Sequence, residues 1–290
     1  TNIIYNASGY LTEIECPILP ISPEKMYRSF NPYPFIPSKG EENDSFTDLF
    51  NIQTHGLAKR LLHTGVDKAV IGISGGLDST LALLVVVKTF DLLGYPRENI
   101  FGITMPGFGT TDRTYSNAVS LMKSAGITVK EISITDAVMH HFDSIGHDPA
   151  IHDVTYENSQ ARERTQILMD FANKVGGLVV GTGNMSELAL GWATYNGDHM
   201  SMYGVNSGVP KTLVSSLVRW IADTQLDNAT SKILHDILDT PFSPELLPAD
   251  NEGKIAQKTE HFVGPYELHD FFLHRMIRFG DRPKRILFMA

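Results

Sequence analysis

Short aliphatic runs alternate with longer amphipathic stretches through the middle of the chain. Four of these runs are rich in Val, Ile and Leu and predict β-strands, at residues 69–73, 100–105, 128–134 and 178–181. Between them, apolar residues recur at helical spacing, which predicts helices at residues 79–93, 114–125 and 159–175. Aliphatic strands that alternate with helices are typical of a parallel sheet covered on both faces, so we expect an α/β fold.

The flanks of this alternating region differ in character. Residues 1–45 are rich in proline and end in an acidic run, which indicates an extended lead-in or linker before a domain at residues 46–290. Further helices are predicted from about residue 45 and at residues 212–222 and 233–238. Residues 241–251 are proline-rich and acidic, and we expect either a loop that covers a site or an ordinary surface loop.

The composition narrows the class of protein. The chain has 290 residues and a formal net charge of -9, which argues against a protein that binds nucleic acid through its overall charge. The longest aliphatic run, residues 81–87, is too short to span a membrane, and no signal peptide is recognisable. The single cysteine, Cys16, excludes an internal disulfide and indicates a cytoplasmic protein; with no histidine nearby, it is expected to be structural.

The turn after the first predicted strand carries the strongest chemical signal. The sequence GISGGLDS, residues 72–79, leads directly from that strand into a helical run. Backbone N–H groups of a glycine-rich turn and of the first helical turn together form an anion site. Asp78 would repel a bare phosphate, so its presence indicates a phosphate that arrives with a divalent cation. The alternative is a helix N-terminus with ordinary capping by Ser and Asp.

Three of the predicted strands end in polar or glycine-rich loops, at residues 74–76, 106–111 and 182–184. Because the carboxyl ends of parallel strands meet at one edge of a sheet, we expect a nucleotide site at this edge. Glu187, early in the helix after the last strand, is placed to share Mg²⁺ with Asp78 and phosphates. Asn184 and Glu187 also have the spacing of a helix-capping box, which is the alternative.

Helix geometry separates two arginines of the helix at residues 159–175. Arg164 lies on the apolar stripe of this helix, whereas Arg162 is rotated by roughly 200° onto another face. We expect Arg162 to contact a ligand and Arg164 to be a structural ion-pair partner. Trp192, beside Gly191 in a polar segment, is expected to stack on an aromatic ring of a ligand, with a core position as the alternative.

Two clusters of charged residues carry weaker signals. Histidines and aspartates alternate within residues 140–153, but their spacing matches no known helical ligand pair, so we expect a solvated polar loop. Lys and Arg gather within residues 275–285. There we favour a solvated face over contact with dinucleotide phosphates or with a neighbouring subunit.

Several motifs resemble a known enzyme family. Ser-Gly-Gly-Leu-Asp-Ser at residues 74–79 resembles the loop of the ATP-pyrophosphatase (PP-loop) superfamily, whose members cleave ATP to AMP and pyrophosphate while adenylating a carboxyl or carbonyl oxygen. Longer motifs resemble the synthetase domain of glutamine-dependent NAD⁺ synthetase, at residues 106–111, 156–164, 181–195, 209–213 and 263–270. The resemblance extends from about residue 45 to the end of the chain. It implies a Rossmann-like parallel sheet of the adenine nucleotide alpha hydrolase type, with helices on both faces.

The resemblance implies amidation of nicotinic acid adenine dinucleotide (deamido-NAD) to NAD⁺, by a ligase that adenylates the nicotinate carboxylate with ATP and then lets ammonia displace AMP. The implied ATP-binding residues are Gly72, Ile73, Ser74, Gly75, Gly76, Leu77, Asp78, Ser79, Thr182 and Lys211. The implied deamido-NAD contacts are Asn158, Arg162, Glu187, Trp192, Ala193, Thr194 and Tyr195. The implied catalytic residues are Asp78, Glu187 and Lys211, of which Asp78 and Glu187 would bind Mg²⁺.

The chain departs from one branch of the family. Ammonia-only synthetases carry a Lys near the position of Tyr195 and an acid near that of Met202, and this chain has neither, which favours the glutamine-dependent branch. In that branch a glutaminase domain precedes the synthetase. The resemblance therefore implies a fragment cut at both ends, which uses free ammonia by itself and glutamine in the full-length protein, and which assembles as a homodimer or higher homo-oligomer. The alternatives are another PP-loop amidating or adenylating enzyme and a non-catalytic nucleotide-binding module.

Overall fold

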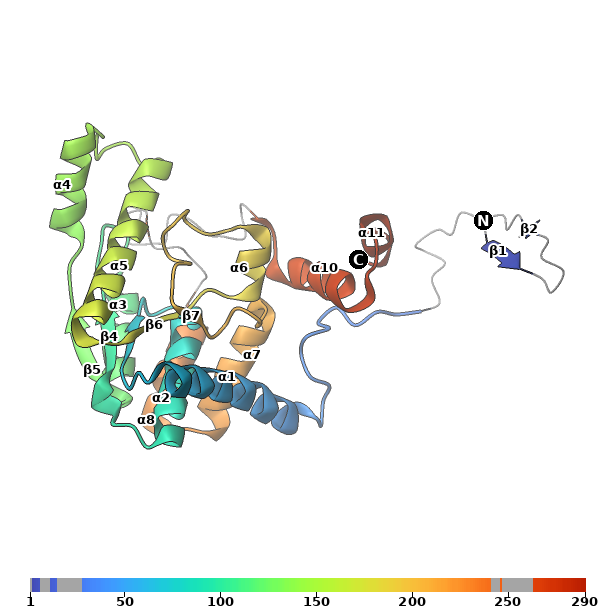
Figure 1. The fold of residues 1–290 in the computed structure, drawn as a ribbon, viewed down its shortest axis with the longest axis horizontal. Helices are drawn as coiled ribbons and strands as arrows, with labels where there is room; N and C mark the ends of the chain where they lie inside the picture. The colour runs from blue at the N-terminus through green and yellow to red at the C-terminus, as the bar shows by residue number, and fades with distance from the viewer. Residues whose placement is uncertain (1, 6–10, 15–27, 241–245, 247–262) are drawn as a thin grey trace.

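Five parallel strands form the central sheet of the protein (Figure 1). The computed structural model describes residues 2–5, 11–14, 28–240, 246 and 263–290. The strands are β3 (Ala69–Gly72), β4 (Ile100–Thr104), β5 (Thr128–Glu131), β6 (Leu178–Gly181) and β7 (Tyr203–Gly204). Their order across the sheet is β5-β4-β3-β6-β7, and each neighbouring pair is parallel. The expected α/β fold with a parallel sheet is confirmed.

Helices cover both faces of this sheet (Figure 1). The larger apolar core lies between the sheet and α1 (Glu42–Thr64), α2 (Leu77–Leu93), α3 (Asp112–Ser124), α7 (Lys211–Thr224) and α8 (Asn228–Leu238). The smaller core lies on the other face, under α4 (Thr135–Ile145) and α5 (Val154–Val175). In β3, Ala69 and Ile71 contribute to the larger core and Val70 to the smaller one, because successive strand residues face opposite sides of a sheet.

The helix α2 is apolar on all sides over residues 81–87. Residues 81–86 are all buried, because α2 packs against β3, α1 and α7 at once. This packing holds the first turn of α2 against the end of β3. In the described part of the chain, no helix is both long enough and apolar enough to cross a membrane.

The order of the strands creates a crevice above β3 and β6. From β3 the chain moves outward through β4 to β5, and it returns to the opposite side of β3 as β6. The connections that follow β3 and β6 therefore lead to opposite sides, which is the arrangement at which α/β sheets bind ligands. The short helix α6 (Met185–Leu190) follows β6 and lies beside this crevice.

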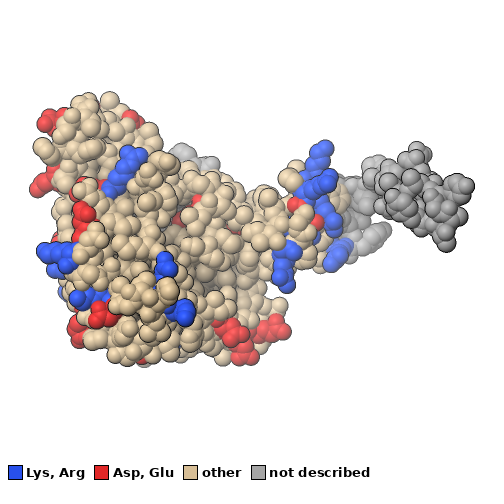
Figure 2. Space-filling view, in the orientation of Figure 1, with Lys and Arg blue, Asp and Glu red and all other residues tan. Residues whose placement is uncertain are grey.

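Smaller elements complete the described chain. A 3-10 helix, Arg97–Asn99, precedes β4, and α10 (Tyr266–Phe279) and α11 (Pro283–Met289) follow at the C-terminal end. Figure 2 shows Lys and Arg side chains gathered over α10 and α11. Arg275 in this group pairs with Asp281 at 2.5 Å and lies over the rings of Phe30 and Phe279. Part of this basic region is therefore used in packing rather than facing solvent.

Residues 1–45 contain secondary structure that was not expected from the sequence. Within residues 1–45, β1 (Asn2–Tyr5) and β2 (Leu11–Ile14) pair as a separate antiparallel sheet, and α1 begins at Glu42. The division into a linker at residues 1–45 and a domain at residues 46–290 stays a prediction.

The polar loop expected within residues 140–153 is wrong in its first half, because residues 140–145 belong to α4, with His140 and His141 on its exposed side. The expected covering loop at residues 241–251 lies outside the described residues except for Leu246. Cys16 also lies outside them.

Candidate active site

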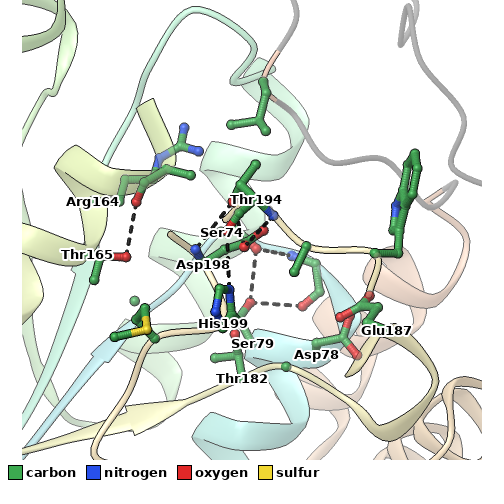
Figure 3. A pocket seen from close by; sticks show the side chains of 18 of the residues that line it. Ser74, Asp78, Ser79, Arg164, Thr165, Thr182, Glu187, Thr194, Asp198 and His199 are labelled. Atoms are coloured by element: carbon green, nitrogen blue, oxygen red, sulfur yellow. Dashed lines mark hydrogen bonds between the residues drawn. The ribbon is translucent and has the colours of Figure 1, made fainter. Parts of the chain in front are cut away.

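The turn from β3 into α2 has a backbone that requires glycine. Gly75 has a φ of 89°, and a Cβ atom there would overlap the carbonyl group of Thr114. Gly76 is the N-cap of α2, and with no side chain to cap the helix it leaves the first N–H groups open to a ligand. Ser74 Oγ accepts from Gly76 N at 3.1 Å and lies 3.2 Å from Ser79 Oγ (Figure 3). The turn therefore offers backbone and hydroxyl donors to an anion.

Two carboxylates and one ammonium group meet beside this turn. Asp78 lies in the first turn of α2, Glu187 in the first turn of α6, and Lys211 is the first residue of α7. Lys211 Nζ pairs with Asp78 Oδ2 and lies 3.2 Å from Glu187 Oε1. The side chain of Lys211 is 7% exposed, and those of Asp78 and Glu187 are 20% and 24% exposed. The two acidic side chains, neighbours in Figure 3, thus converge on one cationic atom.

Burial and charge compete at this group. Burial raises the pKa of Glu187, the charge of Asp78 raises it further, and the Lys211 ammonium offsets only part of this, so the pKa of Glu187 is raised to about 7. Burial alone would lower the pKa of Lys211, but the charges of Asp78 and Glu187 outweigh it and hold that pKa above its usual value. Perturbed groups of this kind in a cavity are typical of functional sites.

Two fully buried asparagines fix the loops that carry the acidic residues. Asn184 Nδ2 donates to Asp78 Oδ1 at 2.9 Å, and Asn184 Oδ1 accepts from Glu187 N at 3.0 Å. The helix cap at Asn184, which the sequence offered as an alternative, is therefore present, and the same side chain also orients Asp78. Asn206 Nδ2 donates to the carbonyl groups of Asp78 and Thr182, at 2.9 and 3.0 Å. Asn206 is not among the candidate residues predicted from the sequence, and no local signal marks it, because these partners lie 128 and 24 residues away.

A cavity of about 590 Å³ extends from this group to α5, a volume in the usual range of ligand pockets. It is lined by the loops after β3, β4 and β6, so the expected convergence of these loops is confirmed. Nearly all the candidate site residues line it: Gly72, Ile73, Ser74, Gly76, Leu77, Asp78, Ser79, Asn158, Thr182, Glu187, Trp192, Ala193, Thr194, Tyr195 and Lys211. Gly75 is buried behind the turn, and Arg162 also lies outside this lining.

One face of α5 forms a wall of the cavity. Its lining residues recur at helical spacing, namely Val154, Glu157, Asn158, Ala161, Arg164, Thr165 and Leu168. Two residues of the apolar stripe of α5, Ala161 and Leu168, are therefore part of the cavity wall.

The two arginines of α5 lie in different surroundings, and only Arg164 lines the cavity. Arg164, expected to be structural, lines the cavity and donates from Nε to the carbonyl group of Met105 at 3.2 Å. Arg162, expected at the ligand, donates from Nε to the carbonyl group of Tyr195 at 3.1 Å. Arg162 thus contacts the segment that carries the other expected substrate residues, and its own contact with substrate stays a prediction.

The segment at residues 192–199 is held in place by hydrogen bonds. Asp198 Oδ1 accepts from N and Oγ1 of Thr194, at 3.0 and 2.6 Å. Thr165 Oγ1 of α5 donates to the carbonyl group of Gly197 at 2.7 Å. Trp192 is only partly buried and lines the cavity, which favours the expected place beside a ligand over a core position. The side chain of Tyr195 is 71% exposed.

The donor set at the acidic pair fits a metal that is shared with a bound molecule. Within the described ranges, no group of three or more His, Cys, Asp and Glu side chains is arranged to hold a metal ion. Asp78 and Glu187 supply two carboxylates that converge on one point. Mg²⁺ is characteristically held by one or two carboxylates together with substrate phosphates, so these residues fit that ion.

The sequence matches the family model described as NAD synthase over residues 49–287. Among curated proteins, it is similar to the glutamine-dependent NAD(+) synthetase of Mycobacterium leprae, with 45% identity over 279 residues, 93% of this chain and 41% of that protein. It is also similar to the glutamine-dependent NAD(+) synthetase of Thermotoga maritima, with 34% identity over 244 residues, 82% of this chain and 39% of that protein. The chain thus spans about two fifths of the length of these relatives.

Solved structures share the fold. NMN synthetase from Francisella tularensis has a TM-score of 0.67 and 23% identity, covering 84% of this chain and 92% of that chain. Glutamine-dependent NAD+ synthetase from Acinetobacter baumannii in complex with adenosine diphosphate has a TM-score of 0.61 and 24% identity, covering 83% of this chain and 41% of that chain. At these identities the similarity bears on the α/β fold alone, which it confirms.

Proposed function

The chain belongs to the NAD synthase family, and we propose that it catalyses the ATP-dependent amidation of deamido-NAD to NAD⁺. A nicotinate carboxylate oxygen attacks the α-phosphorus of ATP, and pyrophosphate leaves. Ammonia then attacks the adenylated carbonyl carbon, AMP leaves with the electrons of the C–O bond, and the nitrogen loses a proton as the amide forms. NAD⁺, AMP and pyrophosphate are then made in equal amounts.

One observation carries this proposal: Asp78, Glu187 and Lys211 meet beside an uncapped, glycine-rich helix start. Pyrophosphate is a poor leaving group unless positive charge gathers around it, and this place combines an ammonium group with backbone N–H donors. Because the chain has a net charge of -9, a site for the negative phosphates of ATP requires a local positive charge, and Lys211 would supply it. Gly72–Ser79 would therefore hold the phosphates of ATP, and Thr182, at the adjoining loop, the adenosine part.

Asp78 and Glu187 would hold Mg²⁺ together with ATP. When bound, Mg²⁺ supplies charge neutralisation to the phosphates during their departure. The support for this assignment is the convergence of the two carboxylates on one cationic atom, 3.2 Å from Glu187 Oε1. Asn184 holds both residues in this orientation through its amide group.

The part of the cavity along α5 would take deamido-NAD. It is continuous with the turn proposed to hold the phosphates, and this would let the nicotinate carboxylate reach the α-phosphorus. Asn158 and the segment Trp192, Ala193, Thr194 and Tyr195 would bind the dinucleotide there, with Glu187 at the junction. Arg162 would act on the same segment through the carbonyl group of Tyr195.

The nitrogen source is part of the proposal, and the descriptions of the relatives support it. The chain matches about two fifths of proteins described as glutamine-dependent. We therefore propose that these residues by themselves use free ammonia, and that a glutaminase domain supplies ammonia from glutamine in the longer protein. Association into a homodimer or higher homo-oligomer is part of the same proposal.

Product analysis tests this function. The chain is incubated with Mg-ATP, deamido-NAD and an ammonium salt, and NAD⁺, AMP and pyrophosphate are measured by chromatography. Equal amounts of the three products are expected, and glutamine in place of ammonium should give none. A second incubation, with xanthosine monophosphate in place of deamido-NAD, tests the alternative that the chain is another amidating enzyme of the PP-loop superfamily. Amidation of that nucleotide, or no consumption of ATP with either acceptor, would contradict the proposal.

A further inference from the structure

Asp270, on α10, is a fully buried carboxylate next to the candidate active site. We propose that it is a positioning residue, which sets the places of Lys211 and Glu187 through the starts of their helices. This inference rests on the proposed function for its kinetic consequence, but the geometry behind it does not depend on that function. Asp270 is 1% exposed and lies outside the cavity lining, so it would act through its neighbours.

Both carboxylate oxygens of Asp270 accept hydrogen bonds from residues that are neighbours of Glu187 and Lys211 in the chain. Oδ2 accepts from Thr212 N at 2.9 Å and from Thr212 Oγ1 at 2.7 Å, and Oδ1 accepts from Ser186 Oγ. Thr212 follows Lys211 in the chain, and Ser186 precedes Glu187. A shift of Asp270 would therefore move Lys211 and Glu187, which are proposed to bind the phosphates and the metal.

Asp270 also replaces a missing cap on α7. The N-cap of α7 is Pro210, which makes no side-chain cap. The first two N–H groups of the helix are satisfied instead by Ser186 Oγ, which accepts from Lys211 N at 2.9 Å, and by Asp270. A negative charge at a helix N-terminus is favourable, because it opposes the positive end of the helix dipole. The cap of α7 therefore comes from two other helices, and this ties α6, α7 and α10 together.

The same face of α10 contacts the side chain of Lys211. Tyr266 lies one turn before Asp270, at the i, i+4 spacing, and its ring centre is 5.7 Å from Lys211 Nζ. Asp270 therefore holds the backbone at Lys211 while Tyr266 packs against its ammonium group.

A buried carboxylate would destabilise the fold without benefit if α10 only had to pack at this position. A buried charge loses its hydration, whereas apolar residues give packing without that cost. Tyr266 and Phe271 already supply buried apolar surface on α10. Asp270 adds directional hydrogen bonds, because three donors from α6 and α7 must point at its carboxylate. We take this as the sign of a positioning role rather than of packing alone.

The experiment compares Asp270→Asn with a matched control, Asp281→Asn. Asp281 is also an acid of the C-terminal segment with a side chain only 6% exposed, but it pairs with Arg275 away from the cavity. Asp270→Asn should lower kcat for NAD⁺ formation at least about tenfold and change the KM for Mg-ATP less than about threefold. Asp281→Asn should lower the melting temperature at least as much and keep kcat within about twofold. Equal kcat losses in the two variants would overturn the positioning role.

Two further measurements keep the test independent of folding and of the proposed reaction. If Asp270→Asn does not fold, Ser186→Ala removes one of the same bonds and should lower kcat in the same way. A crystal structure of the variant without ligand should show Lys211 Nζ displaced from Asp78 or from Glu187. Unchanged contacts would overturn the inference even if the wild type proved to make NAD⁺. If the wild type makes none, the proposed function fails, and the displacement of Lys211 alone decides the positioning role.

Discussion

Lys211 Nζ contacts the carboxylate of Asp78 across 133 residues of sequence. Each residue lies in the first turn of its own helix, and both helices bury an apolar face in the larger core. The contact therefore depends on two packed helices rather than on a loop that must fold around a ligand. Charged groups placed in this way keep their geometry during a reaction, which is the main requirement for electrostatic stabilisation of a transition state.

Replacing Asp78 should separate chemistry from folding. Asp78→Asn keeps the shape of the side chain but removes a charge that the phosphates and Mg²⁺ would require. Turnover should fall by about 100-fold or more, with the circular dichroism spectrum unchanged. Asp91→Asn, at the far end of the same helix and paired with Arg97, is the control and should keep its turnover. Near-normal turnover in Asp78→Asn would remove this residue from the mechanism.

Removing the cation should expose the repulsion between the two acids. Lys211→Met leaves Asp78 and Glu187 facing each other in a largely buried place, and the free energy of unfolding at pH 8 should fall by about 3 kcal/mol. Glu187→Gln in the same chain should restore about 1 kcal/mol or more, because it removes one of the two charges. Urea unfolding measures both values. Lys59→Met, at an exposed position of α1, should change stability by less than about 0.5 kcal/mol. Additive effects of the two substitutions would contradict the coupling.

The raised pKa of Glu187 predicts how stability depends on pH. The folded protein holds this proton up to about pH 7, whereas an unfolded glutamate loses it near 4.5. Between these values the folded state binds more protons, so the free energy of unfolding should fall as pH rises from 4.5 to 7. Glu187→Gln lacks this term, so stability of the wild type should fall relative to that variant by on the order of 2 kcal/mol across the window.

Thermal or urea unfolding without nucleotide, at four values between pH 5 and pH 8, measures this difference. All other titrating groups are common to the two proteins, so they cancel to first order. Parallel pH profiles would show that Glu187 titrates alike in the folded and unfolded chains.

Glycine at position 75 should be required for the shape of the turn. Gly75→Ala places a side chain at a φ of 89°, where it also overlaps the carbonyl group of Thr114. The substitution should cost about 2 kcal/mol or more, measured as a lower free energy of unfolding. Gly208→Ala is the matched control, because a Cβ there meets nothing within 4 Å. A Gly75→Ala protein as stable as this control would mean that the turn adapts easily.

Arg162 should affect one substrate and not the other. Arg162→Gln removes the bond to the carbonyl group of Tyr195 and so loosens the segment at residues 192–195. The KM for deamido-NAD should rise about tenfold, while the KM for ATP stays within about twofold. Gln166→Ala, one turn further along the exposed side of α5, should change neither. An equal rise in both KM values would place Arg162 at a different step.

The spacing of apolar residues predicted most of the strands of the sheet. It failed for elements with few buried residues and for contacts between residues far apart in the chain. β3, β4 and β6 lie within one residue of their predicted bounds, because each is a short run of mostly apolar and mostly buried residues. β5 ends at Glu131 rather than at residue 134, since Ile134 continues the apolar pattern but packs in the smaller core from beyond the strand. α4 escaped prediction because it buries only Val138 and Phe142 among its eleven residues, too few for a helical stripe.

The sequence by itself determined the kind and order of the strands β3 to β6 and of α2, α3 and α5, and it singled out the glycine-rich turn at residues 72–79. These properties follow from periodicity and from residue types within a few positions of each other. Only the tertiary structure decided that α5 lines the cavity with Arg164 rather than Arg162, and that Asn206 and Asp270 hold the acidic group in place. The physical reason is that a hydrogen bond between segments far apart in the chain depends on how whole helices pack. No periodic signal in the sequence records such a bond.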